Sequence, residues 1–412
     1  MSVLKGMRVV EGSAFVAVPL AGMTLAQMGA EVIRFDRIGG GLDAGRWPIA
    51  PSGQSLFWAG MNKGKKSVAV DMKHPEGREL ITRIITAPGP DAGLFLTNLR
   101  VRGWMDYETL SKERDDLVMV TLTGDRHGRP QVDYTVNPAL GIPHMTGPEG
   151  SRDPVAHALP AWDLVAGNMC VSAVLAGERH RLRGHGGQEV EIALKDVAAA
   201  TIGHLGMIGD ATLNPTDRAK AGNALYGAYG QDFLCADGRR VMVIGLTDRQ
   251  WSGLVRATGT ASAMELIERR YGVSLRDEGE RWHRRKEITD ILKPWFSARR
   301  VSDFAEDFDS AGLTWSQFRT VRQALAEDAD LGPENPMFSM LDQPGIGEFA
   351  VPAHPAVFSN ATRTKAVAAP ALGAHTEEIL GDVARLGDTE IARLFDAGIV
   401  SSPRFDNARS AA

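Results

Sequence analysis

The sequence predicts an α/β protein, with a parallel sheet in a large domain and a smaller α+β domain. Strand-like and helix-like segments alternate through the first 200 residues, and the pattern changes near residue 220. Such alternation is typical of a parallel sheet with helices on both faces. We therefore expect residues 1–219 to form most of the large domain and residues 220–325 the small one. Residues 326–412 are expected to return and complete the large domain.

Local patterns predict the elements of the large domain. Apolar residues at helical spacing predict a helix over residues 19–29, and a long apolar run predicts another over 164–177. Pro75 suits the first position of a further helix, because the N–H that proline lacks has no partner there. Apolar or alternating runs predict strands at residues 8–10, 31–35, 66–71, 93–97, 117–123 and 189–194.

The small domain is predicted from a hairpin followed by helices. Asp237 and Gly238 form a typical hairpin turn signal between strand candidates at 233–235 and 240–244. Helical stretches follow around Trp251, over 264–270 and over 287–296. The last ten residues, 403–412, lack apolar periodicity, and we expect them to fray.

Composition argues against several kinds of protein. The net charge of −5 gives no basic field for nucleic acid. No run of 18 apolar residues predicts a membrane span, and no basic segment leads into an apolar one as in a signal peptide. We therefore expect a cytoplasmic protein. Cys170 and Cys235 are too few for a disulfide framework or zinc cluster, and the histidines show no metal-ligand spacing, so no metal site is expected.

Two superficial motifs are better explained without a function. Residues 60–67 lack the glycine and lysine spacing of a P-loop. The basic run at 281–286 lies on a predicted helix, where a solvated face is the usual explanation.

Asp163 is the most informative residue of the chain. It follows Trp162 at the start of an apolar helix, where an aspartate taken alone would be expected to cap the helix. Two segments that accompany it, 176–180 and 184–194, change this interpretation. Together these segments resemble the core signature of the family III CoA-transferases. Further matching segments follow the same order along nearly the whole chain: 4–11, 25–36, 62–73, 237–238 and 369–380.

The resemblance implies a fold and a chemistry. Members of the family have a Rossmann-like large domain and form interlocked homodimers. Asp163 matches the nucleophile that takes an acyl group from a CoA thioester, first as a mixed anhydride and then as an aspartyl-CoA thioester. Coenzyme A is part of the substrate, and no permanently bound cofactor is expected.

The resemblance also implies positions that contact CoA and substrate. Arg37, Val70, Lys73, Asn98 and Leu99 match residues beside the nucleotide. Either Arg100 or Arg102 matches a phosphate-contacting arginine, and the shortened loop leaves both open. The residues expected beside the acyl group are Val16, Tyr134 and Arg46, the last as the cation for a second carboxylate.

Two segments, 10–17 and 39–43, most resemble a branch that moves CoA between the C1 and C4 carboxyl groups of one unsaturated diacid, 2-methylfumarate. That branch serves carbon fixation through the 3-hydroxypropionate cycle. Val16 replaces the glutamine of formyl-CoA transferases, and their Gly-rich loop has no counterpart after residue 220, so we expect a different substrate and a different way of excluding water.

Three alternatives stay open. One is intermolecular transfer of CoA from a donor such as succinyl-CoA to a free acid, since Asp163 would serve both reactions. A 2-methylacyl-CoA racemase is less favoured, because the Gly-His-Asp motif of that branch corresponds to Gln131, Val132 and Asp133 here, which include no histidine. The third is a CoA-binding protein without catalytic activity.

Overall fold

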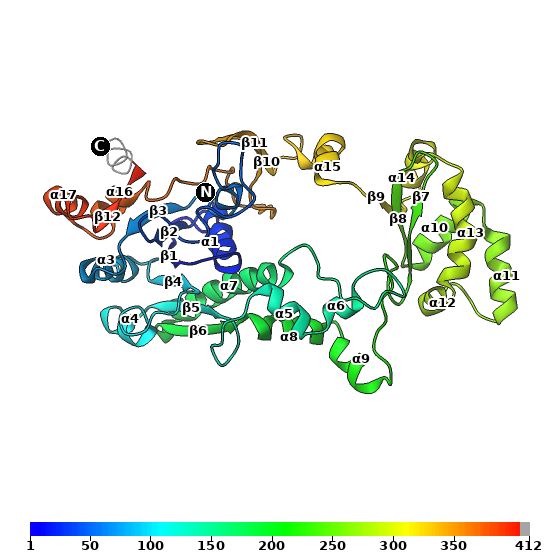
Figure 1. Ribbon diagram of the computed structural model, residues 1–412, viewed down its shortest axis with the longest axis horizontal. Coiled ribbons are helices and arrows are strands. Elements are labelled where there is room, and N and C mark those ends of the chain that lie inside the picture. The colour runs from blue at the N-terminus through cyan, green and yellow to red at the C-terminus, as the bar shows by residue number, and fades with distance from the viewer. Residues whose placement is uncertain (404–412) are drawn as a thin grey trace. The chain divides into compact units, whose positions relative to one another are not determined.

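The computed structural model describes residues 1–403 (Figure 1). Residues 404–412, nearly all of the tail expected to fray, lie outside the described residues. The chain divides into two compact units. Unit 1 comprises Met1–Leu140, Ala158–Thr212 and the chain from Asp328 onward, and unit 2 comprises Gly141–His157 and Leu213–Glu327.

Unit 1 contains a seven-stranded sheet in the order β12-β3-β2-β1-β4-β5-β6. Strands β1 to β6 pair in parallel, and β12 runs antiparallel at the edge beside β3. The order 3-2-1-4-5-6 is that of a Rossmann-like sheet, so the predicted fold class is confirmed for this unit. The strands are β1 (Arg8–Gly12), β2 (Glu31–Asp36), β3 (Lys66–Val70), β4 (Leu94–Thr97), β5 (Val118–Thr123), β6 (Gln188–Ala193) and β12 (Val400–Ser401).

Helices cover both faces of this sheet. On β1, Val10 packs in an apolar cluster with helix α3, whereas the adjacent Glu11 points to helix α1, as the alternation of a strand requires. Helices α16 and α17 join the cluster of α3, and helix α7 packs against α1. The helices are α1 (Ala17–Gln27), α2 (Leu56–Met61), α3 (Pro75–Ile85), α4 (Tyr107–Glu113), α5 (Asp133–Ala139), α7 (Ala161–His180), α8 (Leu194–His204), α16 (Thr376–Asp382) and α17 (Asp388–Asp396). A two-stranded hairpin, β10 (Phe338–Gln343) and β11 (Gly347–Pro352), also belongs to the returning segment.

Helix ends agree with the local sequence. His74 caps α3 by accepting a hydrogen bond from the Glu76 N–H at Nδ1, and Pro75 occupies the first helical position as expected. In unit 2, Thr247 and Gln250 form a reciprocal capping box at the start of α10 (Asp248–Thr258).

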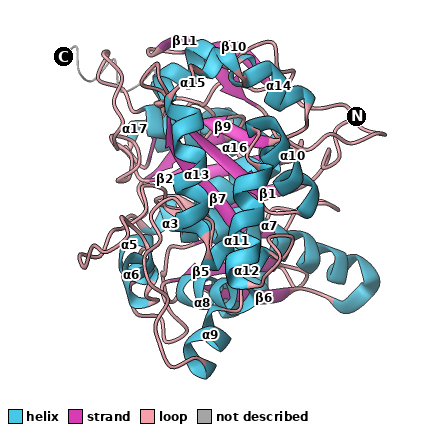
Figure 2. Cartoon of the chain, turned by 90° about the vertical axis from the view of Figure 1, so that its right-hand side faces the viewer, coloured by secondary structure: helices cyan, strands magenta, loops and turns pink. Residues whose placement is uncertain are grey.

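Unit 2 is built on a three-stranded antiparallel sheet of β7 (Tyr229–Leu234), β8 (Arg240–Gly245) and β9 (Thr314–Gln317). The predicted hairpin joins β7 to β8, with Gly238 at a φ of 77°. Helices α10 and α13 (Arg285–Ser297) pack against strands β8 and β7, respectively. In Figure 2, helix α13 lies beside strand β7. The other helices of unit 2 are α6 (Ile142–Met145), α11 (Ala261–Tyr271), α12 (Glu278–His283), α14 (Ala305–Ser310) and α15 (Val321–Glu327). Helix α9 (Met207–Leu213) belongs to unit 1 except for its last residue.

Two sequence interpretations need correction. The segment 141–157 belongs to unit 2, although the sequence pattern assigned it to the large domain. It contains no strand, and it is tied to residues 220–222 by bonds from the Gly222 N–H to the Gly147 carbonyl and from Lys220 to the Asp153 carbonyl.

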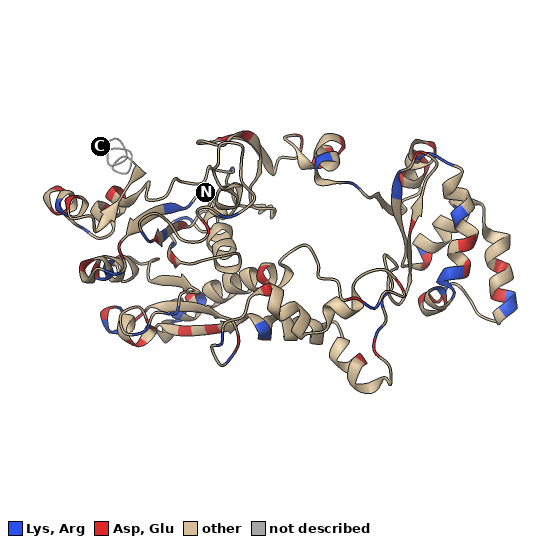
Figure 3. Cartoon of the chain, viewed as in Figure 1, with Lys and Arg blue, Asp and Glu red and all other residues tan. Residues whose placement is uncertain are grey.

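The basic run at 281–286 is not simply a solvated face. Arg281 is buried and donates to the carbonyls of Leu275, Arg276 and Leu246. Arg284 and Arg285 lie over aromatic rings of unit 2. Helices α11 and α13 carry charges of both signs (Figure 3), so neither presents a purely basic surface.

Candidate active site

A cavity of about 770 Å³ opens where β1, β4 and β5 end at the carboxyl edge of the sheet in unit 1. The chain order reverses between β1 and β4, and such a switch point is the usual ligand site of an open α/β sheet. Segments that follow these strands form much of the wall. The lining residues are Ala14 to Ala17 after β1, Asn98 to Arg100 after β4, Leu122 to Gly124 and Gly128 to Tyr134 at and after β5, Leu194 after β6, and Arg46, Trp47, Phe57, Pro160 and Asp163.

Asp163 lies on this wall as the third residue of α7. The position depends on Gly167, one turn further along the helix. A β-carbon at Gly167 would lie 2.7 Å from the carbonyl oxygen of Ala17 and 3.0 Å from the Leu20 side chain. The absence of a side chain therefore lets α7 approach the first turn of α1, and this brings Asp163 beside the loop that follows β1.

The environment of Asp163 raises the pKa of its carboxyl group from 3.8 to about 6. Burial is the main cause, since it disfavours the charged form. The nearby Asp133 carboxylate raises the pKa further, whereas Arg46 lowers it. A carboxyl group of this kind is a stronger base than an exposed aspartate and still ionises near neutral pH, which suits a nucleophile.

Asp133 is a site residue whose role the sequence pattern did not reveal. Its buried Oδ2 accepts hydrogen bonds from the Trp162 N–H at 2.7 Å and the Asp163 N–H at 3.3 Å. Asp133 therefore accepts from two N–H groups in the first turn of α7, and Asp163, the third residue of the helix, does not cap it. Its Oδ1 is buried without a hydrogen-bond partner in residues 1–403. Asp133 lies ten residues after the end of β5, so no local pattern connected it with the start of α7.

Arg46 is the cavity arginine best placed to bind an anion. Three arginines line the cavity, and two have carboxylate partners: Arg129 Nε is 2.6 Å from Asp125, and Arg100 Nη2 is 3.8 Å from Glu191. Arg46 has no carboxylate within 4 Å in the described part of the chain. Its guanidinium instead lies over the rings of Phe15 and Phe57, with its central carbon 5.4 and 5.1 Å from their centroids.

The other positions expected beside the acyl group also lie on the cavity. Val16 is buried and precedes the first residue of α1, and Tyr134 is 56% exposed on α5. Asn98 lies there as well, but its amide is already engaged: it accepts from the Ala14 N–H at 2.9 Å and donates to the Ala14 carbonyl at 2.8 Å. Asn98 thus fixes the loop after β1.

Only some of the positions expected beside the nucleotide line the cavity. Leu99 and Arg100 line the cavity with Asn98, whereas Arg37, Lys73 and Arg102 are exposed and do not line it. Arg37 Nε donates to the Gly40 carbonyl at 2.6 Å. The resemblance placed Val70 beside the nucleotide, but its side chain is fully buried in the core with Ile81 and does not line the cavity. The alternation of β3 directs this side chain inward.

Other chemistries find little support in the described residues. Within residues 1–403, no cluster of three or more histidine, cysteine or acidic side chains could hold a metal ion. Burial raises the pKa of the Cys170 thiol to about 12 and that of Cys235 to about 11, so neither is an activated nucleophile. None of the helices in this range is both long enough and apolar enough to span a membrane.

The fold, with a buried carboxyl group of raised pKa at the switch point of its sheet, agrees with the family comparison. The model of CoA-transferase family III matches residues 4–376. The chain therefore belongs to CoA-transferase family III, and it is an enzyme of that family.

Individual relatives narrow the comparison. The chain is 54% identical to 2-methylfumaryl-CoA isomerase of Chloroflexus aurantiacus, over 97% of this chain and 98% of that protein. It is 26% identical to succinyl-CoA:glutarate CoA-transferase of Homo sapiens, over 96% of this chain and 90% of that one. A solved structure of a CaiB/BaiF family protein from Brucella suis has the same fold. Its TM-score is 0.76 at 23% identity, over 93% of this chain and 99% of that chain.

Proposed function

We propose that the enzyme moves CoA between the two carboxyl groups of 2-methylfumarate, converting mesaconyl-C1-CoA into mesaconyl-C4-CoA. The observation that carries the proposal is one cavity that holds both a reactive carboxyl group, Asp163, and a guanidinium without a carboxylate partner in the described chain, Arg46. A thioester of a diacid has a thioester carbonyl that Asp163 can attack and a free carboxylate that Arg46 can bind. The 54% identity to a 2-methylfumaryl-CoA isomerase supports this choice of diacid.

The reaction needs four acyl transfers. The ionised Asp163 attacks the C1 thioester carbonyl, and the carbon–sulfur bond breaks to give a mixed anhydride and CoA thiolate. The thiolate attacks the aspartyl carbonyl, which forms an aspartyl-CoA thioester and releases the diacid as its dianion. The C4 carboxylate then attacks the carbonyl of this thioester, and the carbon–sulfur bond breaks to give the second anhydride and CoA thiolate again. The thiolate finally attacks the C4 carbonyl, which releases the isomer and restores Asp163.

Arg46 has a role at both ends of this sequence. Its planar guanidinium can bind a carboxylate through two parallel hydrogen bonds. It would hold the free C4 carboxylate while C1 reacts, and the free C1 carboxylate after the diacid has turned. Retention of the diacid in the cavity would give the second attack a high effective concentration and make the transfer intramolecular.

The remaining assignments belong to the same proposal. Arg100, which lines the cavity, is favoured over Arg102 for contact with a CoA phosphate, and Leu99 and Tyr134 would border the bound thioester. We also propose that the enzyme works as a cytoplasmic homodimer, with coenzyme A entering only as part of the substrate, in carbon fixation through the 3-hydroxypropionate cycle. The racemase alternative is not favoured, because no histidine lines the described cavity to oppose Asp163.

The test is incubation of the purified protein with mesaconyl-C1-CoA alone, followed by chromatography and mass analysis. We expect the C4 isomer to form without an added acid and without incorporation of labelled free mesaconate. Asp163→Ala should abolish the reaction. If product forms only when a free carboxylic acid is supplied, or if labelled mesaconate enters it, the enzyme is an intermolecular transferase. A wild-type protein that binds CoA esters without any turnover would contradict both readings.

A further inference from the structure

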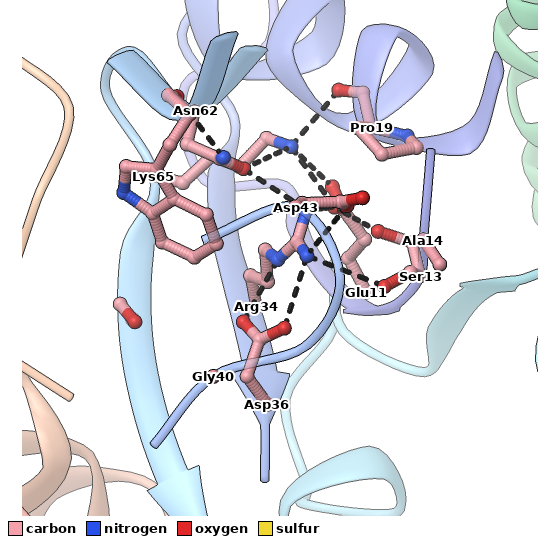
Figure 4. A network of polar contacts seen from close by, with 12 residues as sticks. Glu11, Ser13, Ala14, Pro19, Arg34, Asp36, Gly40, Asp43, Asn62 and Lys65 are labelled. Atoms are coloured by element: carbon pink, nitrogen blue, oxygen red, sulfur yellow. Dashed lines mark hydrogen bonds and ion pairs between the residues drawn. The ribbon is translucent and has the colours of Figure 1, made fainter. Parts of the chain in front are cut away.

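Behind the cavity wall lies a buried network of charged side chains (Figure 4). Arg34 is 1% exposed and forms a bidentate pair with Asp36, with Nε at 2.8 Å from Oδ2 and Nη2 at 2.9 Å from Oδ1. Arg34 Nη2 also donates to Asp43 Oδ2 at 3.1 Å. Lys65 Nζ donates to Glu11 at 2.9 Å and completes the network. None of these five side chains lines the cavity.

Asp43 is the member of this network that contacts the cavity wall. Both of its carboxylate oxygens accept from the Phe15 N–H, at 2.9 and 3.0 Å. Phe15 lines the cavity and has a φ of 68°, a left-handed conformation that is unfavourable for a residue with a β-carbon. Such a conformation persists only where the surroundings hold it, and the charge-assisted bond to Asp43 supplies that constraint.

Phe15 in turn supports Arg46. The Arg46 guanidinium lies over the rings of both Phe15 and Phe57. The backbone of Arg46 is fixed separately, since its carbonyl accepts from the hydroxyl of Ser55, the residue that caps the helix carrying Phe57. Asp43 also lies three residues before Arg46 on the same loop. Asp43 therefore belongs to the loop that carries Arg46, and its buried carboxylate binds Phe15, the residue that supports the Arg46 guanidinium.

We infer that Asp43 is a positioning residue: held by Arg34, it fixes Phe15 and so keeps Arg46 oriented for the second carboxylate of a diacid thioester. The inference rests on the proposed role of Arg46. It predicts that loss of Asp43 weakens recognition of that carboxylate selectively and leaves the binding of the remaining CoA ester unchanged. A purely structural role would weaken both together.

The experiment compares two CoA esters of equal chain length. Succinyl-CoA has a free carboxylate and butyryl-CoA has none, so the ratio of their dissociation constants reports carboxylate recognition alone. Calorimetry on the full-length protein in an Asp163→Asn background avoids turnover. The variants are Asp43→Asn, Arg46→Gln and their combination, with Asp36→Asn as the matched control. Asp36 is equally a partner of Arg34 and is buried, but no bond joins it to Phe15 in the described residues.

We expect Asp43→Asn to weaken succinyl-CoA binding on the order of tenfold, the scale of a misplaced binding group, with butyryl-CoA within about twofold. Asp36→Asn should keep the parent ratio. The double variant should match Arg46→Gln alone, because residues that act through one another are not additive. If Asp43→Asn does not fold, Phe15→Gly is measured instead, since glycine adopts a φ of 68° without help while the ring beneath Arg46 is lost. It should give the same selective loss.

Equal weakening of both esters, an unchanged ratio, or additivity with Arg46→Gln would overturn the inference. A parent protein without preference for succinyl-CoA would overturn it too, because Arg46 would then have no carboxylate to recognise. These outcomes are separate from the proposed function, which depends on the isomerisation of mesaconyl-C1-CoA by the wild-type enzyme. Isomerase activity with a failed ratio test rejects only the role of Asp43, and a successful ratio test without isomerase activity rejects only the reaction.

Discussion

Replacing Asp163 by asparagine should remove activity and at the same time stabilise the fold. Burial and the neighbouring Asp133 raise the pKa of Asp163 from 3.8 to about 6, with Arg46 opposing them. In the unfolded chain these influences are absent, so the folded protein holds this proton more tightly than the unfolded protein does. The free enzyme therefore ionises Asp163 at a cost to its stability, and asparagine, which cannot ionise, does not incur this cost.

The expected gain in the free energy of unfolding follows from the change in the pKa of Asp163. One pKa unit corresponds to about 1.4 kcal/mol, so ionisation of Asp163 lowers the free energy of unfolding by up to about 3 kcal/mol. The stabilising contribution of the protonated group is complete below about pH 4 and is lost as the pH rises through about 6. The advantage of Asp163→Asn should therefore be absent at low pH, grow between about pH 4 and pH 6, and stay constant above.

The assay is urea unfolding of wild type and variant from pH 4 to pH 8, followed by tryptophan fluorescence. Asp196→Asn is a matched control, because Asp196 is likewise the third residue of a helix, α8, but is exposed. It should change stability little at any pH. An Asp163→Asn protein that is no more stable than wild type at pH 8, or whose advantage persists unchanged at pH 4, would refute the claim that burial of a charge at this site is costly.

Four further changes test other parts of the site. The activity of wild type should fall about tenfold per pH unit below about pH 6, where Asp163 becomes protonated. Asp133→Asn should move this fall in the pH–rate profile to lower pH, because Asp133 raises the pKa of Asp163. Gly167→Ala should lower kcat by roughly 100-fold by displacing α7, while circular dichroism stays unchanged. Arg46→Gln should lower kcat/KM for mesaconyl-C1-CoA by about 100-fold, and Arg129→Gln, whose arginine already pairs with Asp125, by much less. Gly22→Ala should cost about 1–3 kcal/mol of stability in a denaturant titration, because its β-carbon would lie 1.7 Å from the buried Glu11 Oε2.

The six parallel strands and helices α1, α3 and α7 of unit 1 could be predicted because each carries a local signal. Pro75, the run over β5 and the apolar helix α7 each carry a local signal that survives in the fold. The placement of residues 141–157 could not be predicted, since bonds from distant residues determine it. The same holds for Arg281, whose partners are backbone carbonyls that no sequence pattern identifies.

Some residues of the candidate site could be predicted from the sequence and others could not. Asp163 and Arg46 were predicted to lie at the active site, and the structure places both on one cavity. Asp133 escaped attention because its importance comes from a hydrogen bond to the start of a different helix. Val70 was misjudged because a match to a segment does not tell which side of a buried strand a residue faces. The family resemblance identified Asp163 as a site residue, whereas the orientation of the side chains depends on tertiary contacts that the sequence does not show.

The cavity receives the Asp163 carboxyl group from α7 and the Arg46 guanidinium from the loop between β2 and α2. The two belong to segments far apart in the chain, and each is fastened to its own support: Asp163 to Asp133, and the Arg46 loop to the network around Arg34. Reactivity and acyl preference can therefore diverge separately during evolution. If Arg46 binds the second carboxylate as proposed, redesign of residues 37–54 should change which acyl group is accepted and leave Asp163 and its support intact.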